Sequence, residues 1–196
     1  MRRPHGVVVA SKNPDKIAEI EAVLASLDPP IVVIPGHNWE DVEETEDTLA
    51  GNALLKAHAV VAATGHAAVA DDTGLDVDAL GGAPGVRTAR YAGEDATYDD
   101  NVEKMLREMA GKQDRSAHFR TAIALVTPGG DELVVEGVLD GVIAAERRGS
   151  GGFGYDPIFE VDGSTLAEIP RDLKNRMSHR ARALLALAEA LGSADG

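Results

Sequence analysis

A short apolar run leads directly into two adjacent carboxylates in the stretch Val69-Ala70-Asp71-Asp72-Thr73-Gly74-Leu75. The apolar residues predict a buried strand that ends where the acids begin. Ionised carboxylates are costly to bury unless a cation, hydrogen-bond donors or water compensates them, so the pair indicates a wet or metal-occupied cleft. Asp, Thr and Gly are also ordinary turn residues, and the two acids taken alone favour a solvated turn.

The composition sets limits on the fold and on the partners. The chain has 196 residues, 44% of them hydrophobic, which is enough for one sizeable core or for two lobes that share a sheet, and we expect a single domain over residues 1–196. The net charge of −14 would repel a nucleic-acid polymer and an anionic membrane. Cysteine is absent, and no apolar run approaches the roughly 18 residues of a membrane span, so we expect a soluble cytoplasmic protein.

The first part of the chain predicts a strand, a polar turn and a helix. Gly6–Ala10 is a β-branched run, Asn13 suits a helix N-cap, and Pro14 suits the first helical position. A turn in this position offers free backbone N–H groups to an anion, and Lys12 and Lys16 add positive charge. The alternative is that both lysines are exposed side chains without a ligand.

An acidic run and a second helix follow a short strand at residues 31–34. Six of the eight residues in Glu40–Asp47 are acids, and such runs are usually solvated loops, although carboxylates are also the ligands that magnesium prefers. Thr48 can cap a helix that continues to Thr64 and ends at Gly65. Lys56 lies within this helix, where spacing alone predicts an exposed side chain.

The second half of the chain predicts a further helix over residues 96–109, a hairpin and a last helix. Alternating residues at 118–125 and 133–145 indicate paired antiparallel strands, so the sheet is expected to be mixed. Ser178 suits the N-cap of the last helix, which places two basic side chains in its first turn, where an anion would offset the helix dipole. The chain beyond Gly192 is expected to fray.

A glycine-rich loop precedes an aromatic pair near the C-terminal end. Gly149-Ser150-Gly151-Gly152-Phe153-Gly154 matches the dinucleotide fingerprint formally, but the residues after it, Tyr155 to Phe159, do not begin a helix, so we exclude a nicotinamide or flavin site. The glycines could instead let the backbone approach a ligand while an aromatic ring stacks on a base. A plain loop with a core-anchoring Phe153 is the alternative.

Six blocks in this order resemble the inosine triphosphate pyrophosphatase family, whose members hydrolyse XTP, ITP and dITP. The resemblance covers nearly the whole chain. The blocks are Ser11-x-Asn13-x-x-Lys16; Glu43-Glu44-Thr45 with Asn52-Ala53-x-x-Lys56-Ala57; Ala70-Asp71-Asp72-Thr73-Gly74-Leu75; Leu80-Gly81-Gly82-Ala83-Pro84-Gly85 with Ala89-Arg90-Tyr91; Gly151-Gly152-Phe153-Gly154-Tyr155-Asp156-Pro157; and Lys174-Asn175 with Ser178-His179-Arg180.

The resemblance implies an α/β fold with a long, curved, mixed β-sheet flanked by helices, two lobes and a central substrate cleft. It also implies a homodimer and a magnesium cofactor. Asp72 would be the catalytic residue that orients or deprotonates the water attacking the α-phosphorus, and Glu43 or Glu44 would hold the metal together with Asp72. Lys56 would add positive charge beside the phosphates. Asn13 and Lys16 would hold phosphate oxygens, Phe153 would stack on the purine, and Lys174, His179 and Arg180 would select the base edge. The other expected substrate-binding residues are Ser11, Lys12, Pro14, Asp15, Thr73, Gly154, Tyr155 and Asp156.

The chain departs from the family pattern in the segment before and within the second helix. Family members usually have Gly, Phe and Glu where this chain has Glu46, Leu49 and Gly51, so a carboxylate near Lys56 is lost unless Glu46 compensates for it. Two other functions therefore stay open: a related pyrophosphatase for pyrimidine or methylated nucleotides, and a nucleotide-binding sensor without turnover.

Overall fold

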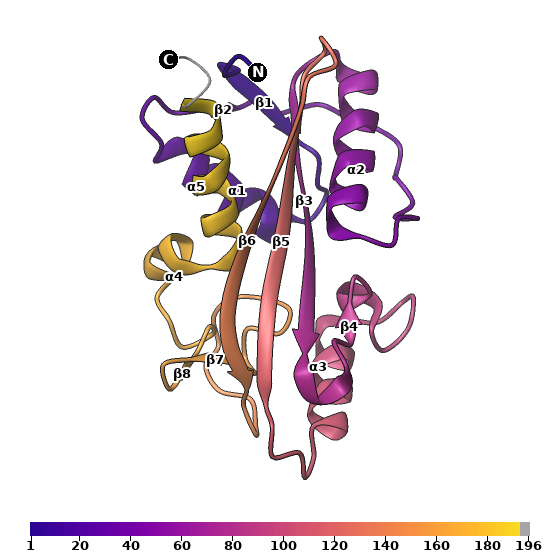
Figure 1. Ribbon diagram of the computed structural model, residues 1–196, viewed down its shortest axis with the longest axis vertical. Coiled ribbons are helices and arrows are strands. Elements are labelled where there is room, and N and C mark those ends of the chain that lie inside the picture. Colours follow the sequence, from indigo (N-terminus) through magenta and orange to yellow (C-terminus); the bar gives the residue numbers. More distant parts are fainter. Residues whose placement is uncertain (193–196) are drawn as a thin grey trace. The chain divides into compact units, whose positions relative to one another are not determined.

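The computed structural model describes residues 1–192, and these form an α/β fold with one mixed, open sheet of eight strands and five α-helices (Figure 1). The order of neighbouring strands is β2-β1-β3-β5-β6-β7-β8, and β4 pairs with β3. The strands are β1 (Gly6–Val9), β2 (Val32–Val33), β3 (Ala68–Val77), β4 (Pro84–Gly85), β5 (Ser116–Val126), β6 (Glu132–Ile143), β7 (Phe159–Val161) and β8 (Ser164–Thr165). The helices are α1 (Pro14–Ala25), α2 (Leu49–Thr64), α3 (Tyr98–Glu108), α4 (Arg171–Met177) and α5 (His179–Gly192), with short 3-10 turns at Asp78–Leu80 and Thr88–Arg90.

The pairing of the strands confirms the mixed sheet. Strand β1 runs parallel to both β2 and β3, with Val8 opposite Ala68. Strand β4 is antiparallel to β3, and β7 is antiparallel to both β6 and β8. None of the helices within residues 1–192 is both long and apolar enough to span a membrane.

The chain divides into two compact units, as the expected two lobes require. Unit 1 consists of Met1–Asp72, Thr121–Gly137 and the segment from Ser178 onward, and unit 2 consists of Thr73–Arg120 and Val138–Met177. Strands β3, β5 and β6 therefore contribute residues to both units. The single domain expected for the whole chain stays a prediction.

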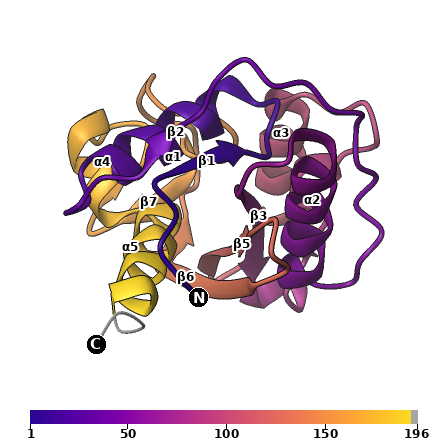
Figure 2. The same cartoon turned by 90° about the horizontal axis from the view of Figure 1, so that it is seen from above.

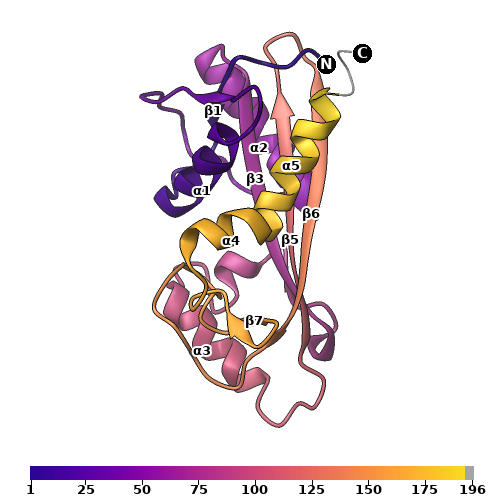
Figure 3. The ribbon, with the colours of Figure 1, turned by 90° about the vertical axis from the view of Figure 1, so that its left-hand side faces the viewer.

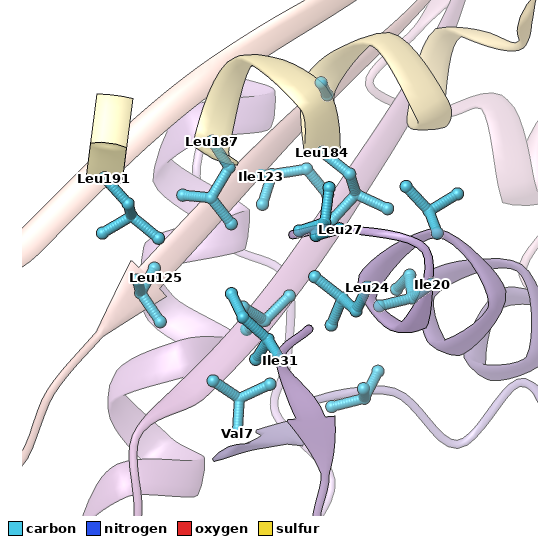
Figure 4. Packing of buried hydrophobic residues seen from close by; sticks show 14 of the residues in the cluster. Val7, Ile20, Leu24, Leu27, Ile31, Ile123, Leu125, Leu184, Leu187 and Leu191 are labelled. Carbon is cyan, nitrogen blue, oxygen red and sulfur yellow. The ribbon is translucent and has the colours of Figure 1, made fainter. Parts of the chain in front are cut away.

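Unit 1 is built around a core of aliphatic side chains. Helices α1 and α5 pack against each other, and in Figure 2 α2 lies on the other side of the sheet. Figure 4 shows Leu184 and Leu187 of α5 pointing toward Ile123 of β5 and toward Leu24 of α1. All four side chains are fully buried. This packing fixes the first turn of α5 and the N-terminal part of α1, which carry basic residues.

Unit 2 has a separate core that contains more aromatic residues. Phe119 of β5 and Phe159 of β7 contact each other with ring centroids 4.5 Å apart, and Met105 and Met109 of the α3 region fill the space around them. The methionines are thus core residues, as their helical spacing indicates. The loop that follows β6 runs beside α3 (Figure 3).

The predicted helix boundaries are largely confirmed. The side chain of Asn13 accepts hydrogen bonds from the N–H groups of Asp15 and Lys16, and that of Thr48 accepts one from Gly51. Ser178 Oγ accepts a hydrogen bond from the N–H of Ala181 at the start of α5. The expected fraying beyond Gly192 concerns residues outside the described part of the chain.

One expectation about the acidic pair is wrong. Strand β3 does not end at Ala70 but continues through Asp71 and Asp72 to Val77. The parallel partner β1 ends at Val9, whose register partner is Val69, but β3 then pairs with β4 and buries Leu75. The acids therefore lie inside a long strand, just past the carboxyl end of the neighbouring strand β1.

Candidate active site

Asp71 is fully enclosed by basic side chains in unit 1. Arg180 donates from Nη2 and Nε to Asp71 Oδ2 over 3.0 and 3.2 Å, and Lys16 Nζ lies 3.2 Å from the same oxygen. Arg180 also donates to Glu19 of α1. Asp71 and Arg180 are 1% and 2% exposed, so the group is a buried ionic cluster that joins β3, α1 and α5.

The basic neighbours determine the ionisation of Asp71. Burial alone would raise the pKa of this carboxyl, but the charges of Lys16 and Arg180 outweigh it and hold the pKa well below its usual range. The pKa of Arg180 is raised in turn, because Asp71 and Glu19 outweigh the effect of burial. Asp71 is therefore a permanently charged residue that fixes its neighbours and is unsuited to accept a proton.

Asp72 points to different partners in the same unit. Its Oδ1 lies 3.1 Å from Lys56 Nζ, and Asn52 Nδ2 donates to its Oδ2 over 3.3 Å. Lys56 Nζ also donates to Glu44 Oε1 over 2.7 Å. Two carboxylates thus share one ammonium group, and the charges of Asp72, Glu44 and Lys56 sum to −1.

This arrangement raises the proton affinity of Asp72. Burial is the largest influence on its pKa, and the negative charge of Glu44 adds to it, so the pKa rises although Lys56 opposes the shift. The pKa of Lys56 is also raised, because Asp72, Asp71 and Glu44 outweigh burial. A partly desolvated carboxylate with a raised pKa is suited to act as a general base.

The acidic segment before α2 supplies one inward-pointing acid. Glu44 is half-buried and reaches Lys56, whereas Glu43 is exposed. No group of three or more His, Asp or Glu side chains within residues 1–192 is arranged as a metal centre. Glu44 and Asp72 nevertheless provide two hard oxygen ligands on either side of Lys56 Nζ, and magnesium is bound by one or two carboxylates with water and substrate phosphate completing its shell. The residues present therefore fit magnesium.

In the turn before α1 the Asn13 side chain accepts hydrogen bonds from the N–H groups of Asp15 and Lys16, and the anion site expected there stays a prediction. The N–H of Asn13 donates to Ser11 Oγ over 3.2 Å, and Pro14 occupies the first helical position. Lys12 pairs with exposed Asp41, and Asp15 is exposed in the first turn. Ser11 and Lys12 also line a cavity of about 460 Å³ beside β1 and the segment that carries Trp39.

The structure explains the departure from the family pattern at Gly51. A Cβ added at Gly51 would lie 2.8 Å from Cβ of Glu46, so the two positions compete for the same space. The N–H of Glu46 donates to Asn52 Oδ1 over 3.0 Å, and Asn52 in turn donates to Asp72. Glu46 is thus held next to the Asp72 cluster through Asn52.

The glycine loop in unit 2 is folded around Asp156. Its Oδ2 accepts hydrogen bonds from the N–H of Phe153 over 2.7 Å and from Lys174 Nζ over 2.6 Å. A Cβ at Gly152, where φ is +71°, would lie 2.0 Å from the same oxygen, so only glycine fits. Lys174 Nζ lies 4.8 Å from the centroid of the Phe153 ring, in the range of a cation–π contact.

Four other expected residues have clear structural positions. Tyr155 is buried in the core of unit 2 and donates its hydroxyl to the carbonyl of Thr88 over 3.0 Å. His179 is buried in unit 1, with Nδ1 2.6 Å from Thr121 Oγ1. Thr73 is half-buried and directly follows Asp72 on β3, and Gly154 adopts a positive φ of +61°.

Sequence reasoning assigned no role to two residues of these clusters. Asn52 was recognised only as part of a motif, yet it joins Asp72 to the acidic segment. Glu19 balances Arg180, and its position three residues after Lys16 was the available signal, since both side chains then lie on one face of α1. Neither partner could be named without the tertiary contacts.

Comparison with known proteins identifies the family. The sequence profile of the Ham1 family matches residues 7–190, so the chain belongs to the Ham1 family and the expected resemblance is confirmed.

Named relatives cover almost the full chain. A dITP/XTP pyrophosphatase of Chlorobaculum tepidum is 47% identical over 95% of this chain and 92% of its own length, and one of Bacillus subtilis is 44% identical over 94% and 96%. Among solved structures, a HAM1 protein from Coxiella burnetii is 42% identical with a TM-score of 0.85, covering 96% of this chain and 98% of that one.

Proposed function

We propose that this protein is a nucleoside triphosphate pyrophosphatase that hydrolyses XTP, ITP and dITP to a nucleoside monophosphate and pyrophosphate. The observation that carries the proposal is the environment of Asp72, a buried carboxylate of raised pKa beside Lys56 and Glu44. The names of the relatives in Chlorobaculum tepidum and Bacillus subtilis support the same activity.

In this proposal Asp72 accepts a proton from the attacking water. The water oxygen forms a bond to the α-phosphorus, the bond from that phosphorus to the oxygen bridging to the β-phosphate breaks, and pyrophosphate leaves. A base whose pKa is raised toward the working pH transfers protons efficiently. Asp71 keeps Arg180 and Lys16 in place and takes no part in proton transfer.

The proposal assigns the triphosphate to basic groups of unit 1. Lys16 and Lys56 supply charge, and a phosphate at the first turn of α1 would replace the Asn13 side chain on the N–H groups of Asp15 and Lys16, since Pro14 has none. Glu44 and Asp72 would hold a magnesium ion, which neutralises phosphate charge when it is bound. This local positive charge is needed because the whole chain carries a net charge of −14.

The base is assigned to the Phe153 loop of unit 2, with Phe153 as the stacking surface and Lys174 as a donor held by Asp156. Donors that point to a 6-keto oxygen accept hypoxanthine or xanthine and disfavour adenine, and Lys174 is such a donor; His179 and Arg180, which the family resemblance assigned to base selection, are instead buried in unit 1 on Thr121 and on Asp71 with Glu19. The proposal also includes a homodimer in the cytoplasm, which sedimentation and cell fractionation would test.

One assay tests the function: pyrophosphate release from a panel of nucleoside triphosphates, with magnesium and with excess EDTA. We expect rapid hydrolysis of XTP, ITP and dITP that collapses in the chelator. Rapid turnover of UTP or dTTP with negligible turnover of ITP would assign the protein to pyrimidine nucleotides instead. Tight nucleotide binding without pyrophosphate release would identify a sensor, and full activity in EDTA would refute the metal.

A further inference from the structure

A second aromatic side chain lies against Phe153 in unit 2. Tyr98 is the first residue of α3, and its ring centroid is 5.9 Å from that of Phe153, with the ring planes inclined by 39°. Both residues line a cavity of about 380 Å³, together with Thr97, Gly152 and Pro157. This volume is within the usual range of small-molecule sites.

The position of Tyr98 is held by contacts on both sides of it. Thr97 and Asp100 form a capping box, in which the N–H of Asp100 donates to Thr97 Oγ1 over 3.2 Å and the N–H of Thr97 donates to Asp100 Oδ2 over 2.9 Å. Arg147, which precedes the glycine loop, donates to the Asp99 side chain and, over 3.1 Å, to its carbonyl. The first turn of α3 is therefore tied to the segment that leads into the Phe153 loop.

A role in core packing does not explain the exposure of the Tyr98 ring. A tyrosine that serves the core is enclosed, as Tyr155 is with 3% of its surface exposed, but Tyr98 keeps 43% of its surface exposed at the cavity. Two neighbouring aromatic rings on one open cavity provide apolar surfaces for a flat ring system. Stacking on such rings is the usual way in which proteins bind nucleobases.

We propose that Tyr98 contacts the nucleobase together with Phe153 and favours purines over pyrimidines. This inference rests on the proposed nucleoside triphosphate substrate and concerns a residue that the family motifs do not include. A two-ring base covers more of two aromatic walls than a one-ring base does, so removal of one wall weakens purine binding more. Arg147 is the positioning residue that keeps Tyr98 beside the Phe153 loop.

The test compares Tyr98→Ala and Tyr98→Phe with the wild-type protein, using kcat and KM for ITP and UTP. We expect Tyr98→Ala to raise KM for ITP about 5-fold or more, the lower end of the stacking range, with kcat within about 2-fold and a smaller change for UTP. Tyr98→Phe keeps the ring and should match the wild type. Leu185→Ala, which removes a side chain of similar exposure (44%) in unit 1, is the control. An unchanged KM in a folded Tyr98→Ala protein overturns the inference.

Calorimetric titration with inosine monophosphate separates this inference from the proposed function. A wild-type protein that binds the monophosphate but releases no pyrophosphate refutes the enzyme, while a 5-fold weaker Tyr98→Ala complex still supports the base contact. A Tyr98→Ala complex of wild-type affinity refutes the base contact alone. Absence of both binding and turnover in the wild type refutes both.

The role of Arg147 is tested by comparing KM for ITP in single and double variants of Arg147 and Tyr98. Arg147→Met should raise KM for ITP with little change in kcat, and Arg147→Lys should restore part of the loss. Because both residues act through one contact, the double variant Tyr98→Ala with Arg147→Met should be no worse than Tyr98→Ala alone. Additive losses would show that Arg147 acts on binding independently of Tyr98, and an unchanged KM in folded Arg147→Met would show that it serves only stability; either result refutes the positioning role.

Discussion

The two faces of β3 shift the pKa values of the neighbouring residues Asp71 and Asp72 in opposite directions. On one side Asp71 is surrounded by Lys16 and Arg180, which lower its pKa and keep it ionised. On the other side Asp72 shares Lys56 with Glu44, and burial together with that second acid raises its pKa. Adjacent side chains on a strand point to opposite faces, so one backbone position separates a structural carboxylate from a reactive one.

The difference in pKa between Asp71 and Asp72 depends on the charges of the side chains that surround each carboxylate. Asp71 has two cations within 3.2 Å of one oxygen, and Glu19 balances only part of their charge. At Asp72 one lysine serves two acids. The charges of Lys56 and Glu44 cancel and leave Asp72 able to attract a proton, a metal ion or a further cation, whereas the net positive charge of the side chains around Asp71 holds it as a fixed anion.

The largest expected effect is a loss of catalytic rate when Asp72, the reactive carboxylate, is replaced. Asp72→Asn should lower kcat for ITP by about 10²–10⁴, because it removes the general base with little change in volume, while nucleotide binding persists. Pyrophosphate release measures the rate. Asp76→Asn, on the same strand but paired with Arg120 in unit 2, is the matched control and should keep the wild-type rate. Wild-type turnover in Asp72→Asn would remove the distinction between the two aspartates.

The second expected effect is a loss of unfolding free energy when Asp71, the structural carboxylate, is replaced. Asp71→Asn leaves Arg180 and Lys16 without their shared carboxylate, and breaking such a buried ionic group costs about 3–5 kcal/mol of unfolding free energy. Asp72→Asn should cost less than about 1 kcal/mol, since the folded protein already disfavours the ionised form of this residue. Urea unfolding of both variants decides the point, and equal losses would contradict it.

The pH dependence of stability should have opposite signs for the two residues. The folded pKa of Asp71 is lowered, so its contribution is complete above its unfolded pKa of about 3.8 and is lost as the pH falls toward the folded value. The folded pKa of Asp72 is raised, so its contribution is present below that unfolded pKa and is lost as the pH rises through the folded value. Unfolding free energies of the wild type minus each variant, measured from about pH 3 to 7, should therefore change in opposite directions.

The smallest effect concerns the support of Asp72 by the acidic segment. Alanine in place of glycine within a helix usually adds about 1 kcal/mol of stability, but Gly51→Ala should not, because the new Cβ would lie 2.8 Å from Cβ of Glu46. In a Glu46→Gly background the contact with Glu46 is gone and only Thr48 Oγ1 stays close, at 3.0 Å, so Gly51→Ala should recover part of the gain. A double-mutant cycle in urea measures the coupling, and independent effects would show that the two positions do not share space.

Much of the fold follows from local sequence. The caps Asn13 and Thr48, the stop at Gly65 and the alternation in β5 and β6 predict elements that the structure confirms, because capping and periodicity act over a few residues. The prediction that β3 ends at Ala70 is wrong, because its pairing with β5 and β4 beyond the end of β1 is a tertiary contact.

For the site, local sequence is enough to identify the chemical groups present: two adjacent acids after an apolar run, an acidic segment before a capped helix, and an aromatic residue in a glycine loop. Their roles depend on contacts that form when the chain folds. The choice of Glu44 over Glu43 as the neighbour of Lys56, and the pairing of Arg180 with Asp71, depend on which side chains meet across elements distant in the chain. A pKa responds to burial and to charges a few ångströms away, so the properties that distinguish Asp72 from Asp71 exist only in the folded protein.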